Sequence, residues 1–217
     1  MSFGVRLKVW GDFACFTRPE MKVERVSYDV MTPSAARGIL EAVYWKPGVR
    51  WVVDRIHVLN PIVFSNIRRN EVGGKVPMGI VQRAIRDGVT PVETFIEEER
   101  QQRAALVLKD VAYVIEAHFE LANGQDDNTA KHREMFERRA RKGQCFTQPY
   151  LGCREFPAAF AWAGDDDRAS GPEGEKDLGW MLWDMDYENN MEARFFRARM
   201  VNGIIEIPVG NGKEVVA

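Results

Sequence analysis

Apolar and polar residues alternate with a period of two in three segments of the first two-thirds of the chain. Residues 5–10 and 111–121 show the alternation most clearly, and it is typical of strands with one buried face. Residues 49–64 are also extended in pattern, with an interruption at Pro61. The three segments are therefore predicted to be strands.

Two other segments carry the end signals of helices. Thr32 and Pro33 are typical of a helix start, and this helix is expected to run to about Tyr44, before Pro47. A second helix is expected over residues 128–143, because it opens on an asparagine and closes on a glycine.

The last third of the chain is β-rich. Residues 178–187 read as a strand, and residues 195–207 as a hairpin. The Asn202-Gly203 pair between its two apolar segments favours a type I′ turn.

This order of elements predicts an α+β fold, in which two helices cover one face of an antiparallel sheet. The ferredoxin-like fold is the commonest version, and the RNA-binding RRM domain shares its topology. We expect a ferredoxin-like N-terminal domain over residues 1–143, with a long hairpin or loop insertion near 65–108. A small β-rich C-terminal domain is expected over residues 144–217.

Composition narrows the class of protein. The chain is 45% hydrophobic, which supports a core, but no apolar run approaches the ~20 residues of a membrane span and the start lacks the apolar segment of a signal peptide. Three cysteines form no CxxC pair and three histidines lie far apart, so no zinc-ligand set is expected. These features favour a cytoplasmic protein with free thiols, no cofactor and no membrane partner.

The net charge of −2 conceals strong segregation of charge. Residues 1–90 carry a net charge of +6 and residues 128–154 a net charge of +5, whereas residues 91–127 and 155–217 carry −6 and −7. Two basic blocks that converge would form a surface for a polyanion such as a nucleic acid. Internal pairing of basic with acidic blocks is the alternative.

Lys131 and His132 fall in the first turn of the second predicted helix. A helix N-terminus offers unpaired N–H groups and a partial positive charge, which hold a phosphate readily. The same field and the lysine disfavour protonation of the imidazole, so His132 is expected to stay neutral near pH 7 and to accept a proton. The pair suggests phosphodiester chemistry. The alternative is that His132 merely packs on the body of the protein, because it shares a helix face with Phe136 and Ala140.

Several segments together resemble CRISPR-associated protein 5 of subtype I-C, a member of the RAMP superfamily. The most specific is residues 11–47, which end in AVYWKP; further matches are WVVDRIHVLNPI, DVAYVIEAHFEL, AKHREMFERRARKG, LGCREF, DLGWML and MVNGIIEIP. The segment GQCFTQPYLG after the second helix departs from relatives that carry glycine and arginine there.

The resemblance implies a ferredoxin-like domain followed by a small β-rich domain. It implies an endoribonuclease that cuts precursor CRISPR RNA at the base of the repeat hairpin without a metal ion. The protein would then stay on the 5′ handle as a subunit of the antiviral surveillance complex, beside a backbone RAMP subunit and a large subunit. DNA stays open as a further partner. The catalytic set that it implies is Tyr44 in AVYWKP, with Lys131 and His132 in AKH.

In such a site His132 would act as base or acid, and Lys131 would neutralise charge on the phosphorane. Tyr44 would position the 2′-OH or the phosphate, or transfer a second proton. The hypothesis requires Tyr44 and His132 to converge within about 15 Å. His118 and His57 are rival histidines, although both fall on predicted strands where hydrogen bonding across the sheet is the simpler role.

RNA-holding candidates are the basic residues near this proposed site. They are Lys22, Arg25, Arg37, Lys46, Arg68, Arg69, Arg138, Arg139 and Arg141.

Two other functions stay open on the sequence. One is a non-catalytic module that caps the 5′ handle. The other is a metal-dependent DNA nuclease that uses the Asp165-Asp166-Asp167 run, although such an acidic run is more often a solvated loop.

Overall fold

The residues that the structure describes form an α+β fold around a ten-stranded, mostly antiparallel sheet. The computed structural model describes residues 4–21, 23–93, 95–121, 128–164, 167, 172–187, 189–208 and 214–216.

Four neighbouring strands, called here the central strands, lie in the order β3-β5-β1-β6, with β6 at the edge of the sheet. They are β1 (Val5–Ala14), β3 (Val49–Val58), β5 (Arg100–Leu121) and β6 (Ala159–Trp162), and each is antiparallel to its neighbours. The alternation that predicted β1 is confirmed by burial, since Val5, Leu7 and Val9 are at most 1% exposed. One face of this central sheet is therefore apolar and carries the core.

The two predicted helices are present with the predicted caps. In α1 (Pro33–Val43) the hydroxyl of Thr32 accepts a hydrogen bond from the N–H of Ala35. In α4 (Thr129–Lys142) the side chain of Asn128 accepts from the N–H of Lys131, and Gly143 ends the helix with a φ of 62°. These side-chain and glycine caps satisfy backbone groups that have no partner within a helix.

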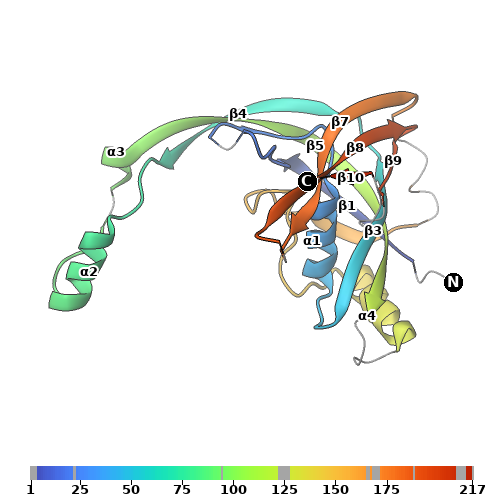
Figure 1. The fold of residues 1–217 in the computed structure, drawn as a ribbon, viewed down its shortest axis with the longest axis horizontal. Helices are drawn as coiled ribbons and strands as arrows, with labels where there is room; N and C mark the ends of the chain where they lie inside the picture. Colours follow the sequence, from blue (N-terminus) through green and yellow to red (C-terminus); the bar gives the residue numbers. More distant parts are fainter. Residues whose placement is uncertain are drawn as a thin grey trace.

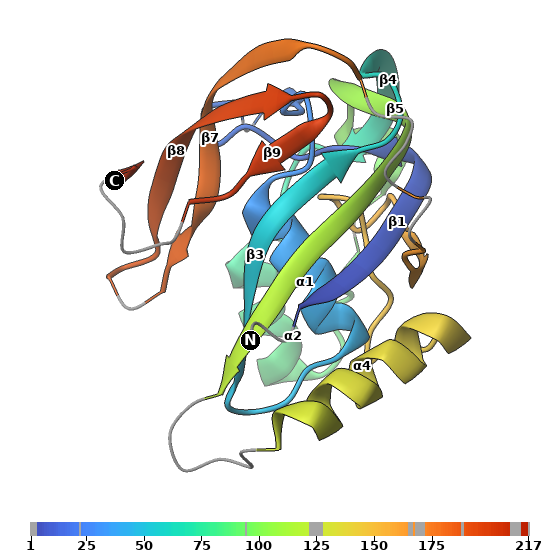
Figure 2. The same ribbon diagram turned by 90° about the vertical axis from the view of Figure 1, so that its right-hand side faces the viewer.

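Both helices pack on the apolar face of the central strands. α1 packs on β3, and α4 packs on β6 and β1. Figure 2 shows α1 behind β3 and β5, with α4 near the lower ends of the strands. Phe136 of α4 is fully buried between Trp51 of β3 and Trp162 of β6. This aromatic cluster fixes the helix on the sheet.

The region near 65–108, expected as a long hairpin or loop insertion, is a long arm built on two paired antiparallel strands. β4 (Val63–Val72) pairs along its whole length with the first ten residues of β5. Between them lie α2 (Met78–Asp87) and the short α3 (Ile96–Glu99), at the far end of the arm in Figure 1. A two-residue strand, β2 (Arg25–Val26), runs parallel to β5 at the base of the arm.

The strands after α4 join the same sheet. They are β7 (Glu175–Asp186), β8 (Glu192–Val201), β9 (Ile204–Glu206) and β10 (Val215–Val216), and β9 pairs with β3. Asn202 and Gly203 join β8 to β9 with φ values of 48° and 75°, as a type I′ turn requires, so the predicted hairpin is confirmed. No helix in the described ranges is long and apolar enough to cross a membrane.

Candidate active site

The end of α1 is held by three other parts of the fold. The carbonyl groups of residues 42–44 fall where a helix leaves acceptors without partners. Each of them accepts a hydrogen bond from a different part of the chain. In chain order, the three carbonyls accept from the N–H of Phe146 (2.7 Å), the guanidinium of Arg139 (2.9 Å) and the indole of Trp51 (3.1 Å). The α1 terminus, and Tyr44 with it, is therefore fixed against α4 and β3.

Tyr44 and His132 are in direct contact. The Tyr44 hydroxyl lies 2.7 Å from Nδ1 of His132, and the two side chains are only 2% and 6% exposed. Which of the two atoms carries the shared proton depends on the tautomer of the imidazole. The requirement that these helix ends converge is met.

His132 begins a stripe of residues along one face of α4. Phe136, Arg139 and Ala140 follow at helical spacing, and Phe136 and Ala140 are buried with it. The guanidinium carbon of Arg139 lies 5.3 Å from the centre of the Tyr44 ring, a cation–π distance. The sequence did not mark Arg139 as a partner of Tyr44, although its spacing of seven residues from His132 places it on the same face.

Lys131 precedes His132 in the first turn of α4, and its side chain is exposed. Its backbone N–H donates to the side chain of Asn128 at 3.0 Å. Successive helix residues point about 100° apart, so Lys131 projects from the surface beside the buried imidazole.

The rival histidines lie on the opposite face of the sheet, away from α1 and α4. Nδ1 of His118 is 2.8 Å from the carboxylate of Asp54 on the neighbouring strand. Nε2 of His57 is 3.2 Å from Glu116, also on a neighbouring strand. Both are bound across the sheet, as their strand positions suggested.

Four of the predicted RNA-holding residues lie near the Tyr44–His132 pair. Lys46 follows Tyr44 closely in the chain, and Arg138, Arg139 and Arg141 are on α4. Lys46, Arg138 and Arg141 are exposed, and Arg141 forms an ion pair with Glu137 one turn earlier.

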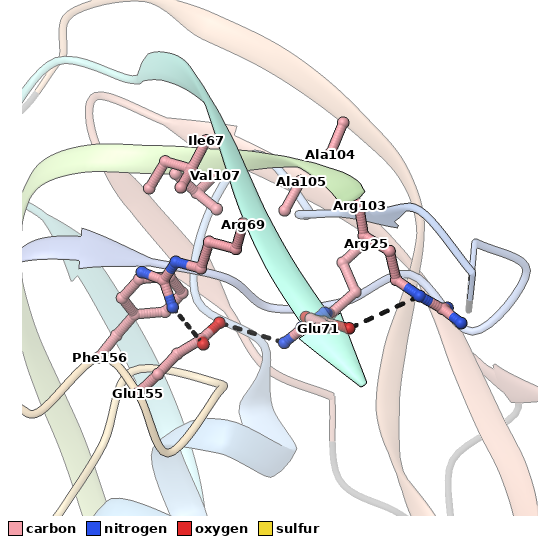
Figure 3. A pocket seen from close by; sticks show the side chains of 10 residues that line it. All are labelled: Arg25, Ile67, Arg69, Glu71, Arg103, Ala104, Ala105, Val107, Glu155 and Phe156. Carbon is pink, nitrogen blue, oxygen red and sulfur yellow. Dashed lines mark hydrogen bonds and ion pairs between the residues drawn. The ribbon is translucent and has the colours of Figure 1, made fainter. Parts of the chain in front are cut away.

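Of the four other candidates that the structure describes, three bind carboxylates. Arg25 and Arg69 converge on Glu155, and Arg25 also contacts Glu71 (Figure 3). Arg37 binds Asp184 through two hydrogen bonds and Glu41 through a third. Arg68 is exposed on β4.

Part of the predicted set falls outside the described residues. Lys22 is one such residue, and so are Asp165 and Asp166 of the acidic run. Asp167 lies 2.6 Å from the ammonium of Lys8. Among the residues that the structure describes, no three His, Cys, Asp or Glu side chains are grouped as ligands for a metal ion.

Comparison with known proteins identifies the family. A family model for Cas5d, described as CRISPR-associated protein Cas5, matches residues 4–208 of the 217. The chain belongs to the Cas5d family. The match spans α1, the arm, α4 and most of the last strands, so every element of the candidate site is included.

Two relatives carry the name CRISPR pre-crRNA endoribonuclease Cas5d. The protein of Mannheimia succiniciproducens is 56% identical, and the match covers 99% of each chain. The protein of Thermus thermophilus is 42% identical over 97% of this chain and 94% of its own. A solved crystal structure of a CRISPR-associated protein superposes with a TM-score of 0.70 at 25% identity, over 99% of this chain and 96% of the other. The two chains thus share their fold over essentially the whole length.

Proposed function

We propose that this chain is an endoribonuclease that cleaves precursor CRISPR RNA at the base of the repeat hairpin without a metal ion. The names of the two Cas5d relatives support the substrate and the reaction type. The observation that carries the proposal is the buried hydrogen bond between Tyr44 and His132, with Lys131 beside it. After cleavage the protein stays on the 5′ handle of the guide RNA, as a subunit of the type I-C surveillance complex with its backbone and large subunits.

RNA supplies its own nucleophile in this reaction. The 2′-OH loses a proton and attacks the neighbouring phosphorus, and the bond to the 5′ oxygen breaks as that oxygen gains a proton. The products are a 2′,3′-cyclic phosphate and a 5′-OH. The protein therefore has to move protons and stabilise the charged phosphorane.

His132 is the proton-transfer group in this proposal. Its Nδ1 contacts Tyr44, and we assign the exchange with the RNA to the other ring nitrogen, Nε2. If Tyr44 donates a hydrogen bond to Nδ1, Nε2 carries the hydrogen of the neutral ring; as Nε2 protonates the leaving 5′ oxygen, the Tyr44 proton passes to Nδ1 and the ring stays neutral. If Nδ1 donates to Tyr44, Nε2 is the acceptor for the proton of the 2′-OH.

Tyr44 acts through His132 in this proposal and does not touch the RNA. Its ring is 2% exposed and its hydroxyl is on the imidazole, so it is a positioning residue that sets the ring orientation and the tautomer. Lys131 is exposed at the helix N-terminus, where its ammonium would neutralise charge on the phosphorane.

The RNA-holding surface that we propose is centred on two exposed cations close to the pair, Lys46 and Arg138, with Arg68 on the arm. Arg141 is also exposed, and RNA would share it with Glu137. Arg25, Arg37 and Arg69 already bind carboxylates, so their charge is largely compensated within the protein. Binding through phosphate contacts weakens as salt is added, because it releases counterions.

We also infer that the central unit is ferredoxin-like. The strand order β3-β5-β1-β6 with crossovers through α1 and α4 supports it, and β6 is its last strand. Strands β7–β10 then form the β-rich C-terminal part, which joins the unit through β9 and β3.

The decisive experiment is cleavage of repeat RNA by the purified protein in EDTA. His132→Ala is expected to lower the cleavage rate at least ~10²-fold, the usual contribution of a general acid or base. His118→Ala is the matched control, since its imidazole binds Asp54 on the other sheet face, and it should cleave normally. RNA that is bound but intact would support the non-catalytic module, and cleavage that appears only with a divalent ion would support the metal-dependent nuclease.

A further inference from the structure

Next to the candidate site, two aromatic side chains stack on each other at the protein surface. The ring centres of Trp45 and Phe146 are 6.1 Å apart, with an angle of 28° between their planes. Their side chains are 50% and 62% exposed. Large apolar rings are normally buried, so a stacked and exposed pair is an unusual surface feature.

The backbone holds both rings in place beside Tyr44. Tyr44 is extended, with φ −144° and ψ 106°, and successive side chains of an extended chain point to opposite sides. Tyr44 therefore enters the core and Trp45 projects outward. Phe146 is fixed by its N–H, which donates to the carbonyl of Ala42 at 2.7 Å. The aromatic pair is thus anchored to the same helix end that positions Tyr44.

The surroundings of the pair are polar and basic. Lys46 follows Trp45, and Gln144 and Thr147 flank Phe146 within two residues; all three are exposed. The last turn of α4, which leads into this loop, carries Arg139, Arg141 and Lys142. A docking surface for another protein would have a broad apolar centre, whereas flat rings flanked by cations are typical of sites for single-stranded RNA.

We propose that Trp45 and Phe146 stack an unpaired nucleobase of the RNA close to the cleaved bond, and so position the scissile phosphate over His132. The inference rests on the proposed ribonuclease function and adds a nucleobase-binding site to it. Every base has a flat face, so the site is tolerant of sequence and requires only that the base be unpaired. It therefore favours a cut where duplex meets single strand.

The test is a pair of matched changes in protein and RNA. Binding is measured with His132→Ala protein, so that RNA is not cleaved during the titration. Trp45→Ala in that background is expected to weaken binding of repeat RNA about tenfold, the usual effect of losing one base–aromatic stack. Trp45→Phe keeps a stacking face and should restore most of the affinity. Trp180→Ala is the control, because Trp180 is a similarly exposed tryptophan (52%) on β7.

The RNA is then made abasic at each unpaired position next to the cleaved bond in turn. If the missing base is the one that stacks, the abasic RNA should bind the protein with Trp45 about tenfold more weakly than intact RNA does. With that abasic RNA, Trp45→Ala should not lower the affinity further. Equal Trp45→Ala losses on every RNA would mean that the ring acts through protein structure, and would overturn the proposal. So would unchanged binding by Trp45→Ala.

Failure of the ribonuclease proposal gives a different result. In that case the protein with His132 intact does not cleave repeat RNA, whatever residue stands at position 45. In protein that does cleave, Trp45→Ala should raise KM for the repeat RNA more than it lowers kcat. A substitution that only damaged the fold would lower the melting temperature. It would also weaken binding of every abasic RNA by the same factor.

Discussion

The hydroxyl of Tyr44 lies 2.7 Å from Nδ1 of His132, although 88 positions separate the two residues in the chain. One side chain leaves the C-terminal end of α1 and the other enters at the first turn of α4. Their contact makes the two helix ends a single chemical unit, and it is the basis of the first prediction.

Tyr44→Phe keeps the buried ring and removes only the hydroxyl. Nδ1 of His132 then loses its partner, so the imidazole is no longer held in one orientation and tautomer. We expect kcat for RNA cleavage to fall roughly tenfold, a part of the usual contribution of a general acid or base, with KM nearly unchanged. Single-turnover cleavage and a binding titration measure the two effects. Tyr150→Phe is the control, because Tyr150 is 40% exposed, and wild-type activity in Tyr44→Phe would contradict the positioning role.

Arg37→Ala should affect stability and leave RNA binding intact. Arg37 and Asp184 form a double hydrogen bond with side chains 22% and 18% exposed, so the change leaves a partly buried carboxylate without its cation. The expected loss is about 2 kcal/mol of unfolding free energy, measured by urea denaturation. Arg50→Ala, which breaks an exposed pair with Glu120, should cost less than about 1 kcal/mol. If Arg37→Ala left the stability unchanged but weakened RNA affinity, the result would contradict this role and indicate that Arg37 binds RNA.

Cys153 should react as a thiolate at neutral pH. Its pKa is lowered to about 6, because a hydrogen bond from Cys15 and smaller contributions from Thr17 and Arg25 outweigh the effect of burial. The thiolate fraction rises with pH, so alkylation by iodoacetamide should be half-maximal near pH 6 and decline below it. Alkylation of Cys153 is measured by peptide mass spectrometry. The protein carries Cys145→Ser, which removes the other free cysteine that is not buried.

The control for Cys153 is Cys15→Ala, which removes the first of these causes. The pH of half-maximal alkylation should then rise toward that of a free cysteine, roughly 8.5. An unchanged midpoint would show that Cys15 does not stabilise the thiolate.

Gly152→Ala should be strongly destabilising. Gly152 has a φ of 84°, and a Cβ there would overlap the carbonyl oxygen of Cys15. Backbone strain of roughly 1–2 kcal/mol adds to this overlap, so we expect a loss above about 2 kcal/mol in urea denaturation. Gly88→Ala has a φ of 67° but nothing within 4 Å of its Cβ, and should show the strain alone. Equal losses in the two variants would mean that the chain near Cys15 moves aside freely.

The parts of the fold that local chemistry determines were predictable from the sequence. The caps of both main helices and the Asn202-Gly203 turn depend on residues within a few positions of each other, and all are found as expected. The first half of β5 fell within the long hairpin or loop expected near 65–108 and was not assigned as a strand, because its residues 100–106 are all exposed or half-buried and show no alternation. The helix α2 was not predicted, although Met78, Val81 and Ile85 recur at helical spacing; none of its residues is buried.

The site could be predicted only in part. Lys131 and His132 stood out because a helix N-terminus is readable locally. Tyr44 came only from family resemblance, since no spacing rule connects it with His132. The carboxylate that holds Arg37 lies 147 positions away, and such a pairing cannot be inferred from charge along one chain.

One strand connects the arm to the candidate site. β5 has 22 residues, well beyond the usual 3–10, and its contour length is about 70 Å. Its first ten residues form the arm with β4, and near its other end Phe119 packs its ring 6.1 Å from that of His132. From Leu108 onward the strand is hydrogen-bonded to β1 or β3, so the arm and the residue that supports the imidazole belong to one continuous strand within one sheet. RNA that contacted both the arm and His132 would therefore bind two sites whose spacing is set by a single strand.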